Sequence, residues 1–536
     1  MMSQSPTPWW QGAVIYQVYP RSFCDSSGDG VGDLAGLLDR LDHIASLGVD
    51  AVWVSPFFPS PMADFGYDIC DYTGVDPIFG TLGDVDGLIR AAHQRGLKLI
   101  IDQVYSHSSD RHPWFQQSRL DRHNPKADWY IWADAKSDGT PPNNWQSVFG
   151  GPAWSWGTER RQYYLHNFLS QQPDLNLRHT EVQQALLDVA QFWLDRGVDG
   201  FRLDAANFFL CDRDLRDNPP GDAANPLRPY FFQKHLHDRS VPDTLAFLER
   251  FRAFLDTHPG AMAVAEIFDE DAIARTIEYT GGAKRLHTAY NFAYLNLTAP
   301  LSAAALRAPT EEWEAQAPDA WPSWAFSNHD VPRVVSRLGG AQASPAVAKL
   351  LMTVLMFLRG TIFVYQGEEL GLPQAEIPYD RLQDPEALRN WPHTMGRDGG
   401  RTPMPWIADR PYAGFSVADP WLPVPDSHHA LAVDRQEDQS DSMLHLTRQL
   451  IGLRRDHPAL RSGTIAFADL PEPVLGVIRT AGDGTRAVAL LNLGQAPCTV
   501  PADTIEGLRV VDLGLRGHVR PDGIDLPGFG GLIAVT

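Results

Sequence analysis

The stretch DLAGLLDRLDHIASLGVDAVWVS, residues 33–55, joins an amphipathic segment to a short apolar run. Leu34, Leu37, Leu41 and Ile44 recur at the three- and four-residue spacing of one helix face, and Gly48 ends the pattern. The run DAVWVS (50–55) that follows is typical of a buried strand. A helix that leads directly into a buried strand indicates a parallel sheet with helical crossovers.

The same alternation extends in both directions from this stretch. AVIYQVY (13–19) precedes it, and a helical pattern followed by LKLIID (97–102) comes after it. Further strands are predicted at 198–204, at 261–266, near 324 and from 361, with a weaker pair between 272 and 295 and a closing helix from 441. Eight strand–helix units in one chain predict a (β/α)8 TIM barrel of the α/β class.

Two segments depart from the alternation. Residues 105–176 are rich in Trp, Pro, Asn and Asp and are too long for a plain connection. We therefore predict an inserted subdomain at 105–176, after strand 3 of a catalytic barrel made of residues 1–104 and 177–458. From 459 to 536 the pattern changes to short β-runs separated by turn residues, which predicts a C-terminal antiparallel β domain.

Composition excludes several classes of function. The chain has 536 residues and a net charge of −21, which disfavours nucleic acid because phosphates require basic surface. Its four cysteines are scattered and form no CxxC pair, so neither a disulfide framework nor a zinc site is expected. We see no signal peptide, and no apolar stretch of the ~18 residues that would span a membrane. We therefore expect a cytoplasmic protein with a neutral, small-molecule substrate.

Carboxylates lie at the ends of several predicted strands. Asp204 ends strand 4, Glu266 ends strand 5, and strand 7 runs into Asp330. Barrel enzymes place their active sites at this edge, and two carboxyl groups are the minimum for glycoside hydrolysis. Each carboxylate alone could cap a helix or close a loop. The three together favour a catalytic site, because an unpaired buried carboxylate is costly.

The neighbours of two carboxylates suggest different protonation states. Arg202 lies two residues before Asp204 and on the same face of the strand, so we expect it to hold Asp204 ionised. Glu266 follows the apolar run AMAVA, and partial burial there would raise its pKa and keep it protonated. An ionised carboxylate suits a nucleophile, and a protonated one suits a general acid.

At this point the sequence resembles the alpha-amylase family of glycoside hydrolases (family 13). The resemblance rests on DQVYSH (102–107), GFRLDAAN (200–207), AEIFD (265–269) and FSNHD (326–330), which occur in the family's order. GYDICDY (66–72) and RTPMPW (401–406) are similar to the alpha-glucosidase and oligo-1,6-glucosidase branch. The resemblance covers roughly residues 10–455.

The resemblance implies a role for each residue of the predicted site. Asp204 would be the nucleophile, Glu266 the acid and base, and Asp330 the group that grips sugar hydroxyls and stabilises the transition state. His107, Arg202 and His329 would bind hydroxyls or orient the carboxylates.

Further residues would set the specificity of the pocket. Asp64 and Arg401 would hold the 4-hydroxyl of a terminal glucose and make the enzyme exo-acting, above the stacking ring of Tyr67. Phe149 and Phe168 would line the pocket, with core packing as the alternative for each.

The expected function is a retaining, exo-acting alpha-glucosidase that cleaves α-1,4-linked glucose from maltose-type substrates. The small residue Ala205 after the nucleophile suggests the α-1,4 preference, because α-1,6-acting relatives tend to carry Val there. Transfer of glucose to alcohol or phenol acceptors is also expected. Trehalose synthases and sucrose-acting isomerases or hydrolases share the fold and remain alternatives. A non-catalytic binding relative would have lost the carboxylates. We expect a monomer or homodimer.

The segment DSSGDGVGDLAG (25–36) places oxygen donors on alternate residues around glycines. Gly36 stands where an EF-hand needs a bidentate Glu, so the loop is not an EF-hand. The alternative is a glycine-rich turn in which Asp33 caps the next helix. The family branch implies a structural Ca²⁺ (or Mg²⁺) here, and no organic cofactor, with the ligands Asp25, Ser27, Asp29, the Val31 carbonyl and Asp33.

Overall fold

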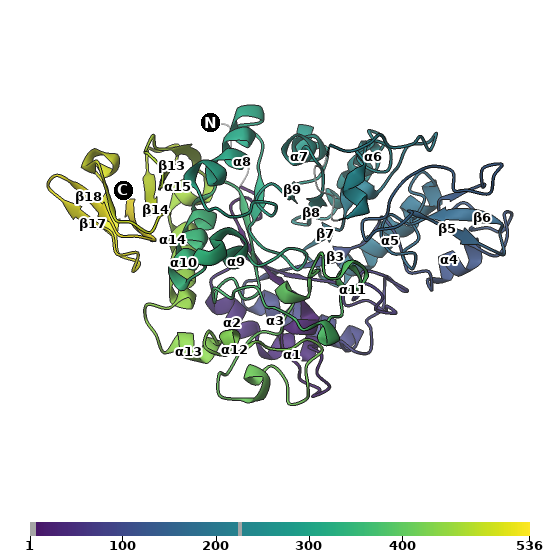
Figure 1. Ribbon diagram of the computed structural model, residues 1–536, viewed down its shortest axis with the longest axis horizontal. Coiled ribbons are helices and arrows are strands. Elements are labelled where there is room, and N and C mark those ends of the chain that lie inside the picture. The colour runs from purple at the N-terminus through teal and green to yellow at the C-terminus, as the bar shows by residue number, and fades with distance from the viewer. Residues whose placement is uncertain (1–6, 223–227) are drawn as a thin grey trace.

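The computed structural model describes residues 7–222 and 228–536, and a closed parallel barrel lies at its centre (Figure 1). Its strands follow one another around the barrel in the order β1-β11-β10-β9-β8-β7-β3-β2. This confirms the predicted TIM barrel, including the weak sixth unit, and the strands are β1 (Val14–Val18), β2 (Ala51–Val54), β3 (Lys98–Gln103), β7 (Gly200–Leu203), β8 (Met262–Ile267), β9 (Thr288–Asn291), β10 (Ser323–Ala325) and β11 (Thr361–Tyr365).

Helices surround the barrel and bury their apolar faces against it. The helix predicted at 33–48 is divided into α1 (Leu34–Asp39) and α2 (Leu41–Ser46), because Arg40 leaves the helical region with φ −103° and ψ 5°. The other principal helices are α3 (Leu82–Gln94), α5 (Thr180–Asp195), α6 (Thr244–Leu255), α7 (Ala272–Thr280), α8 (Ala303–Gln316), α9 (Val334–Gly339), α10 (Pro345–Phe357) and α14 (Met443–Asp456). In the described residues, no helix is both long and apolar enough to cross a bilayer.

A small sheet follows β3 and stands to one side of the barrel (Figure 1). Its strands β4 (Trp132–Ala133), β6 (Gln162–Leu165) and β5 (Trp154–Gly157) pair in the antiparallel order β4-β6-β5, with α4 (Pro113–Ser118) beside them. The ring of Phe115 stacks on Trp132 with 5.6 Å between centroids. Aromatic packing of this kind accounts for the many Trp and Tyr residues of the segment.

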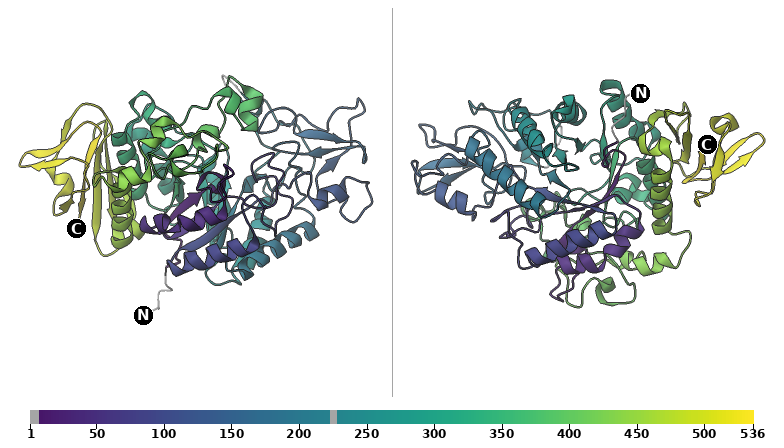
Figure 2. Two further views of the ribbon diagram at one scale, coloured as in Figure 1. Left: turned by 90° about the horizontal axis from the view of Figure 1, so that it is seen from below. Right: turned by 180° about the vertical axis from the view of Figure 1, so that it is seen from behind.

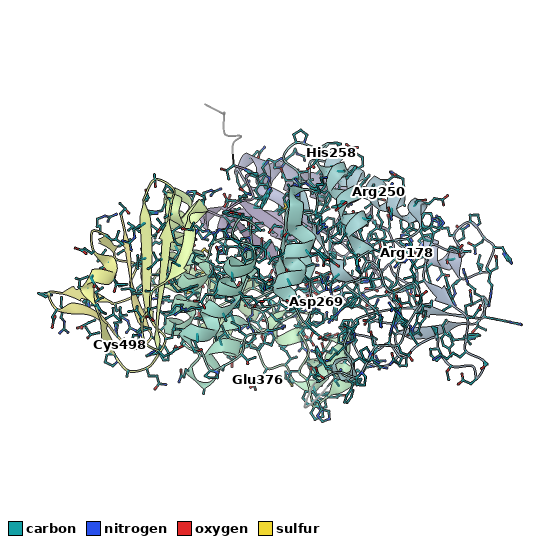
Figure 3. The ribbon with its side chains drawn as sticks, turned by 90° about the horizontal axis from the view of Figure 1, so that it is seen from above. Arg178, Arg250, His258, Asp269, Glu376 and Cys498 are labelled. Atoms are coloured by element: carbon teal, nitrogen blue, oxygen red, sulfur yellow. The ribbon has the colours of Figure 1, made fainter. Side chains whose placement is uncertain are left out.

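The C-terminal residues form two antiparallel sheets, as predicted for this end of the chain. Figure 2 shows them on the far side of the barrel from the β4-β6-β5 sheet. Cys498, labelled in Figure 3, lies in these sheets. One sheet contains β12 (Thr464–Phe467), β13 (Val474–Thr480), β14 (Arg486–Asn492), β19 (Gly530–Val535) and β16 (Arg509–Val511), and the other contains β15 (Cys498–Val500), β18 (Gly523–Leu526) and β17 (His518–Arg520).

A long segment after β11 supplies side chains to the mouth of the barrel. It contains the short helices α11 (Pro385–Asn390), α12 (Asp426–His429) and α13 (Val433–Glu437), and α15 (Pro458–Ser462) follows α14. Asp384 caps α11 by accepting the backbone N–H of Glu386. Two residues of this segment, Glu386 and Arg397, line a cavity at the carboxyl ends of the barrel strands.

Candidate active site

A cavity of about 140 Å³ opens at the carboxyl ends of the barrel strands. Asp204 follows β7, Glu266 lies near the end of β8, and Asp330 follows β10, and all three line this cavity. Parallel strands bring their carboxyl ends to one edge of a barrel. The topology thus places three carboxylates from distant parts of the sequence around a single space.

The guanidinium of Arg202 lies beneath the carboxylates and connects two of them. Its Nη1 donates to Oδ1 of Asp204 at 2.7 Å, and its Nη2 lies 2.6 Å from Oε2 of Glu266. Nη1 also donates to Asp102 at 2.7 Å. Arg202 is fully buried and does not line the cavity in the described structure, so it orients the carboxylates from below.

Burial dominates the acid–base properties of the two bridged carboxyl groups. Burial raises the pKa of Glu266 to about 7, as expected from the apolar run before it. Burial also raises the pKa of Asp204 to about 7, against the lowering effect of Arg202. Asp102 and Asp330 add to this rise, because the guanidinium is shared and cannot offset every negative charge near it. The pair therefore titrates as one unit that holds a single proton near neutrality.

Asp330 has a different environment. Arg401 donates to its Oδ1 at 2.8 Å and Arg397 does so at 3.2 Å. These guanidiniums and His329 hold the pKa of Asp330 well below its usual range, although burial opposes them. Asp330 is therefore ionised wherever Asp204 and Glu266 share their proton.

The predicted pairing of Asp64 with Arg401 is wrong. Asp64 pairs with Arg397, whose Nη2 lies 2.8 Å from Oδ1 of Asp64. Arg401 instead donates through Nε to the His329 carbonyl at 2.6 Å and is fully buried. A 3₁₀ turn at Asp398–Gly400 separates the two arginines and directs only the first one into the cavity.

Tyr67 lines the cavity and is fixed from behind by His329. The two rings stack with 5.3 Å between centroids, and the Tyr67 hydroxyl lies 2.6 Å from Nε2 of His329. Burial lowers the pKa of His329 to about 3, so its ring is neutral. Gln17 donates to Nδ1 at 2.8 Å, which leaves Nε2–H to donate to Tyr67. His329 does not line the cavity in the described structure and acts through Tyr67.

His107, Phe149 and Phe168 form part of the cavity wall. The rings of His107 and Phe168 lie 5.1 Å apart, and those of Phe149 and Phe168 lie 6.1 Å apart. Burial lowers the pKa of His107 to about 3, so this wall carries no positive charge. Both phenylalanines therefore face the cavity as well as packing against other rings.

Residues 17–463 match the family of alpha amylase catalytic domains. The chain belongs to the alpha-amylase family. A Rhizobium meliloti family member named "Probable alpha-glucosidase" is 50% identical over 98% of this chain and 97% of its own length. An oligo-1,6-glucosidase from Heyndrickxia coagulans is 35% identical over 91% of this chain and 93% of its own length. The crystal structure of an alpha-glucosyl transfer enzyme has 52% identity and a TM-score of 0.94, covering 99% of each chain.

Several residues of this alpha-amylase-family site were not predicted from the sequence. Arg397 could have been found, because it lies only four residues before Arg401. Arg228 and Glu386 lie outside every recognised motif, so no signal pointed to them. The wall residues that were also missed are Val148, Phe208, Phe268 and Phe292.

In the loop at 25–36, two of the predicted ligands, Asp25 and Asp33, already accept hydrogen bonds from the loop backbone. Asp33 caps α1 by accepting the Gly36 N–H at 2.6 Å, and it also accepts the backbone N–H groups of Ser26 and Ser27. Asp25 accepts the N–H groups of Gly28 and Gly30. In the part of the chain that the structure describes, no three acidic, His or Cys side chains gather as a metal site would need. The expected ligand set also includes a Ser hydroxyl and a main-chain carbonyl, so the cation at this loop stays a prediction.

Proposed function

We propose that this protein is a retaining, exo-acting alpha-glucosidase that releases terminal α-1,4-linked glucose from maltose-type substrates. The observation that carries the proposal is the guanidinium of Arg202 bridging Asp204 and Glu266 in a cavity that Asp330 also lines. Two carboxyl groups that share one proton supply both a nucleophile and an acid.

The chemistry follows from the protonation state of the pair. Ionised Asp204 attacks the anomeric carbon, the glycosidic C–O bond breaks, and Glu266 gives its proton to the leaving oxygen. Glu266 then takes a proton from water, whose oxygen attacks the anomeric carbon and breaks the ester to Asp204. The configuration is inverted twice and thus retained. Asp330, held ionised by Arg397 and Arg401, stabilises the positive charge that develops on the sugar ring.

Exo action is supported by the ion pair of Asp64 and Arg397 on the cavity wall. Burial raises the pKa of Asp64, while Arg397 favours its ionised form. A carboxylate and a guanidinium held 2.8 Å apart offer an acceptor and donors to the hydroxyls of a terminal sugar. Arg397 takes here the role that we expected of Arg401.

Transfer of glucose to alcohol or phenol acceptors is part of the same proposal. The covalent intermediate can be attacked by any hydroxyl that reaches Glu266 in place of water. The 52% identity to a solved alpha-glucosyl transfer enzyme supports this view. Incubation of maltose with a phenolic acceptor should yield an alpha-glucoside, and glucose as the sole product would contradict the transfer proposal.

Other solved relatives are named trehalose-6-phosphate hydrolase and trehalulose synthase, with TM-scores of 0.88 and 0.89. A panel of maltose, isomaltose, sucrose, trehalose and nigerose tests the choice of substrate. We expect the highest kcat/KM on maltose. Isomerisation of sucrose or a strong preference for trehalose would overturn the proposal. We retain the predictions of a cytoplasmic protein and of a monomer or homodimer, which size-exclusion chromatography with light scattering can check for the assembly.

A further inference from the structure

An ion pair that the mechanism does not use lies on the wall of the cavity. Arg228 lies at the start of the 3₁₀ turn Pro229–Phe232, after β7, and Glu386 lies on α11, after β11. The Arg228 guanidinium contacts Oε1 of Glu386, and both side chains line the cavity. The pair thus joins two separate segments at the wall of the cavity that Asp204 and Glu266 also line.

The other charges of the cavity show what this pair does. The only lining guanidiniums in the described residues are those of Arg228 and Arg397. Arg397 is held by carboxylates, including Asp64 and Asp384 at 2.8 and 2.9 Å. Arg228 is therefore the cation that could attract an anionic group, and Glu386 neutralises it.

The electrostatic interaction within the pair is only weakly screened by solvent, because one partner is buried. The side chain of Glu386 is 5% exposed and that of Arg228 is 33% exposed. Burial raises the pKa of Glu386, while the guanidiniums of Arg228 and Arg397 oppose the rise. Removal of either partner would leave an uncompensated charge at a partly desolvated site, where charges interact much more strongly than in water.

Exposed aromatic side chains lie beside Arg228 on one segment and near α11 on the other. Phe231 lies 5.9 Å from the Arg228 guanidinium, and the rings of Tyr379 and Trp391 lie 5.1 Å apart near α11. These three are between 39% and 55% exposed. A neutral group loses little beside such side chains, whereas a charged group loses solvation and finds its possible partner already paired.

We infer that the Arg228–Glu386 pair makes the protein select electrically neutral leaving groups and acceptors and reject charged ones, phosphorylated sugars included. This rests on the proposed glucosidase function and deepens it. Relatives at 30–36% identity are named trehalose-6-phosphate hydrolase, and by this inference the chain differs from them in its substrate. Any phosphate on the substrate must then be removed by a phosphatase reaction before this enzyme acts.

Three aryl alpha-glucosides of matched shape test the inference: a neutral 4-carbamoylphenyl, an anionic 4-carboxyphenyl and a cationic 4-(trimethylammonio)phenyl glucoside. For each variant, kcat/KM on each probe is divided by the wild-type value, which cancels differences in leaving ability. Glu386→Gln frees Arg228 and should raise the anionic-to-neutral ratio roughly tenfold. Arg228→Gln leaves Glu386 alone and should raise the cationic-to-neutral ratio by a similar factor.

Two further variants separate charge selection from a merely structural role. Arg228→Gln combined with Glu386→Gln removes both charges and should return the ratios to within about twofold of wild type. Arg389→Gln, on the same helix, removes a hydrogen bond to the Gly150 carbonyl but leaves the ion pair. It should change all three probes by one common factor.

The outcomes distinguish this inference from the proposed function. If Glu386→Gln and Arg228→Gln change the three probes equally, the pair only braces the cavity wall and the inference is wrong. If the wild type does not cleave the neutral glucoside at all, the proposed function fails instead. Trehalose 6-phosphate gives a second readout, because Glu386→Gln should improve its kcat/KM relative to that of trehalose.

Discussion

At the residue scale, the arrangement of one guanidinium and two carboxyl groups determines the chemistry. Arg202 contacts Asp204 and Glu266 and so holds both carboxyl groups at one side of the cavity. We expect Asp204→Asn to lower kcat on an aryl alpha-glucoside by about 10⁴-fold, because an amide cannot form the covalent ester. Asp214→Asn, an exposed change, serves as control. Unchanged turnover in Asp204→Asn would disprove the nucleophile assignment.

The shared proton predicts a bell-shaped dependence of kcat/KM on pH. Burial raises the pKa values of both Asp204 and Glu266 to about 7. Below this region both groups are protonated and Asp204 cannot attack; above it both are ionised and Glu266 has no proton to give. Glu266→Gln, assayed on alpha-glucosyl fluoride, which needs no acid, should keep the acid limb and lose the alkaline limb. Wild-type kcat/KM of Glu266→Gln on an alpha-glucoside with a poor, alkoxide leaving group would mean that another group is the acid.

The residues that could and could not be predicted differ in one respect. Asp204, Glu266 and Asp330 end strands, so the count of strands alone places them at one edge. Arg228 precedes a 3₁₀ turn and Glu386 lies on the short helix α11, and both elements belong to long connections whose path depends on tertiary contacts. The exchange of Arg401 for Arg397 arises from a single 3₁₀ turn, which the sequence does not reveal.

At the scale of elements, the turn after β7 constrains both stability and specificity. Ala205 has φ 42° and ψ 48°, in the left-handed region, and its N–H donates to Oε2 of Glu266 at 3.2 Å. Ala205→Val puts a β-branched residue into this conformation, and we expect it to cost about 1–2 kcal/mol of folding free energy. The ratio of kcat/KM on maltose to that on isomaltose should also fall. A denaturant midpoint equal to that of the wild type would contradict the expected loss of stability. An unchanged maltose-to-isomaltose ratio of kcat/KM would contradict the expected change in specificity.

The loop at 25–36 is a second element whose role can be tested. Asp33 accepts hydrogen bonds from four groups, the N–H and hydroxyl of Ser26 and the N–H groups of Ser27 and Gly36, and so fixes the start of α1. Asp33→Ala should lower stability by about 0.5–2 kcal/mol through loss of the cap. If these hydrogen bonds alone hold the loop, chelator should leave both Tm and kcat of the wild type unchanged. A fall in Tm with chelator would support the cation predicted from the sequence instead.

Helices and strands were predicted best where the hydrophobic periodicity is strong. They were predicted worst where the conformation of a single residue sets an element's boundary. The alternation of strands and helices predicted the barrel because each strand is buried on both faces and each helix on one. The break between α1 and α2 depends on the conformation of Arg40, which lies over the ring of Trp406 at 4.6 Å. Trp406 is far away in the sequence, so local patterning held no sign of this contact.

At the scale of the whole molecule, one buried arginine connects the C-terminal sheets to the barrel, and a second one binds the same helix end from within the barrel. Arg479 on β13 donates to the carbonyls of Phe357 and Leu358 at the end of α10, and Arg454 on α14 donates to those of Met356 and Leu358. Burial lowers the pKa of Arg479, and the neighbouring charge of Arg454 adds to this effect. Main-chain carbonyls thus stabilise the cations here, as they do at the negative end of a helix dipole.

This arrangement predicts that the C-terminal sheets unfold together with the barrel. Arg479→Met keeps the length of the side chain but leaves buried carbonyls unsatisfied, at a cost of about 1–3 kcal/mol for each group. We expect Arg479→Met to have a lower Tm than the wild type. Its kcat/KM at 25 °C should be unchanged, because Arg479 does not line the cavity. The wild type should show one calorimetric transition. Arg486→Met, on the neighbouring strand β14, is the matched control and should leave Tm nearly unchanged. A buried contact that joins two cores makes the stability of each depend on the other. Two separate transitions in the wild type would therefore show that Arg479 does not couple the C-terminal sheets to the barrel.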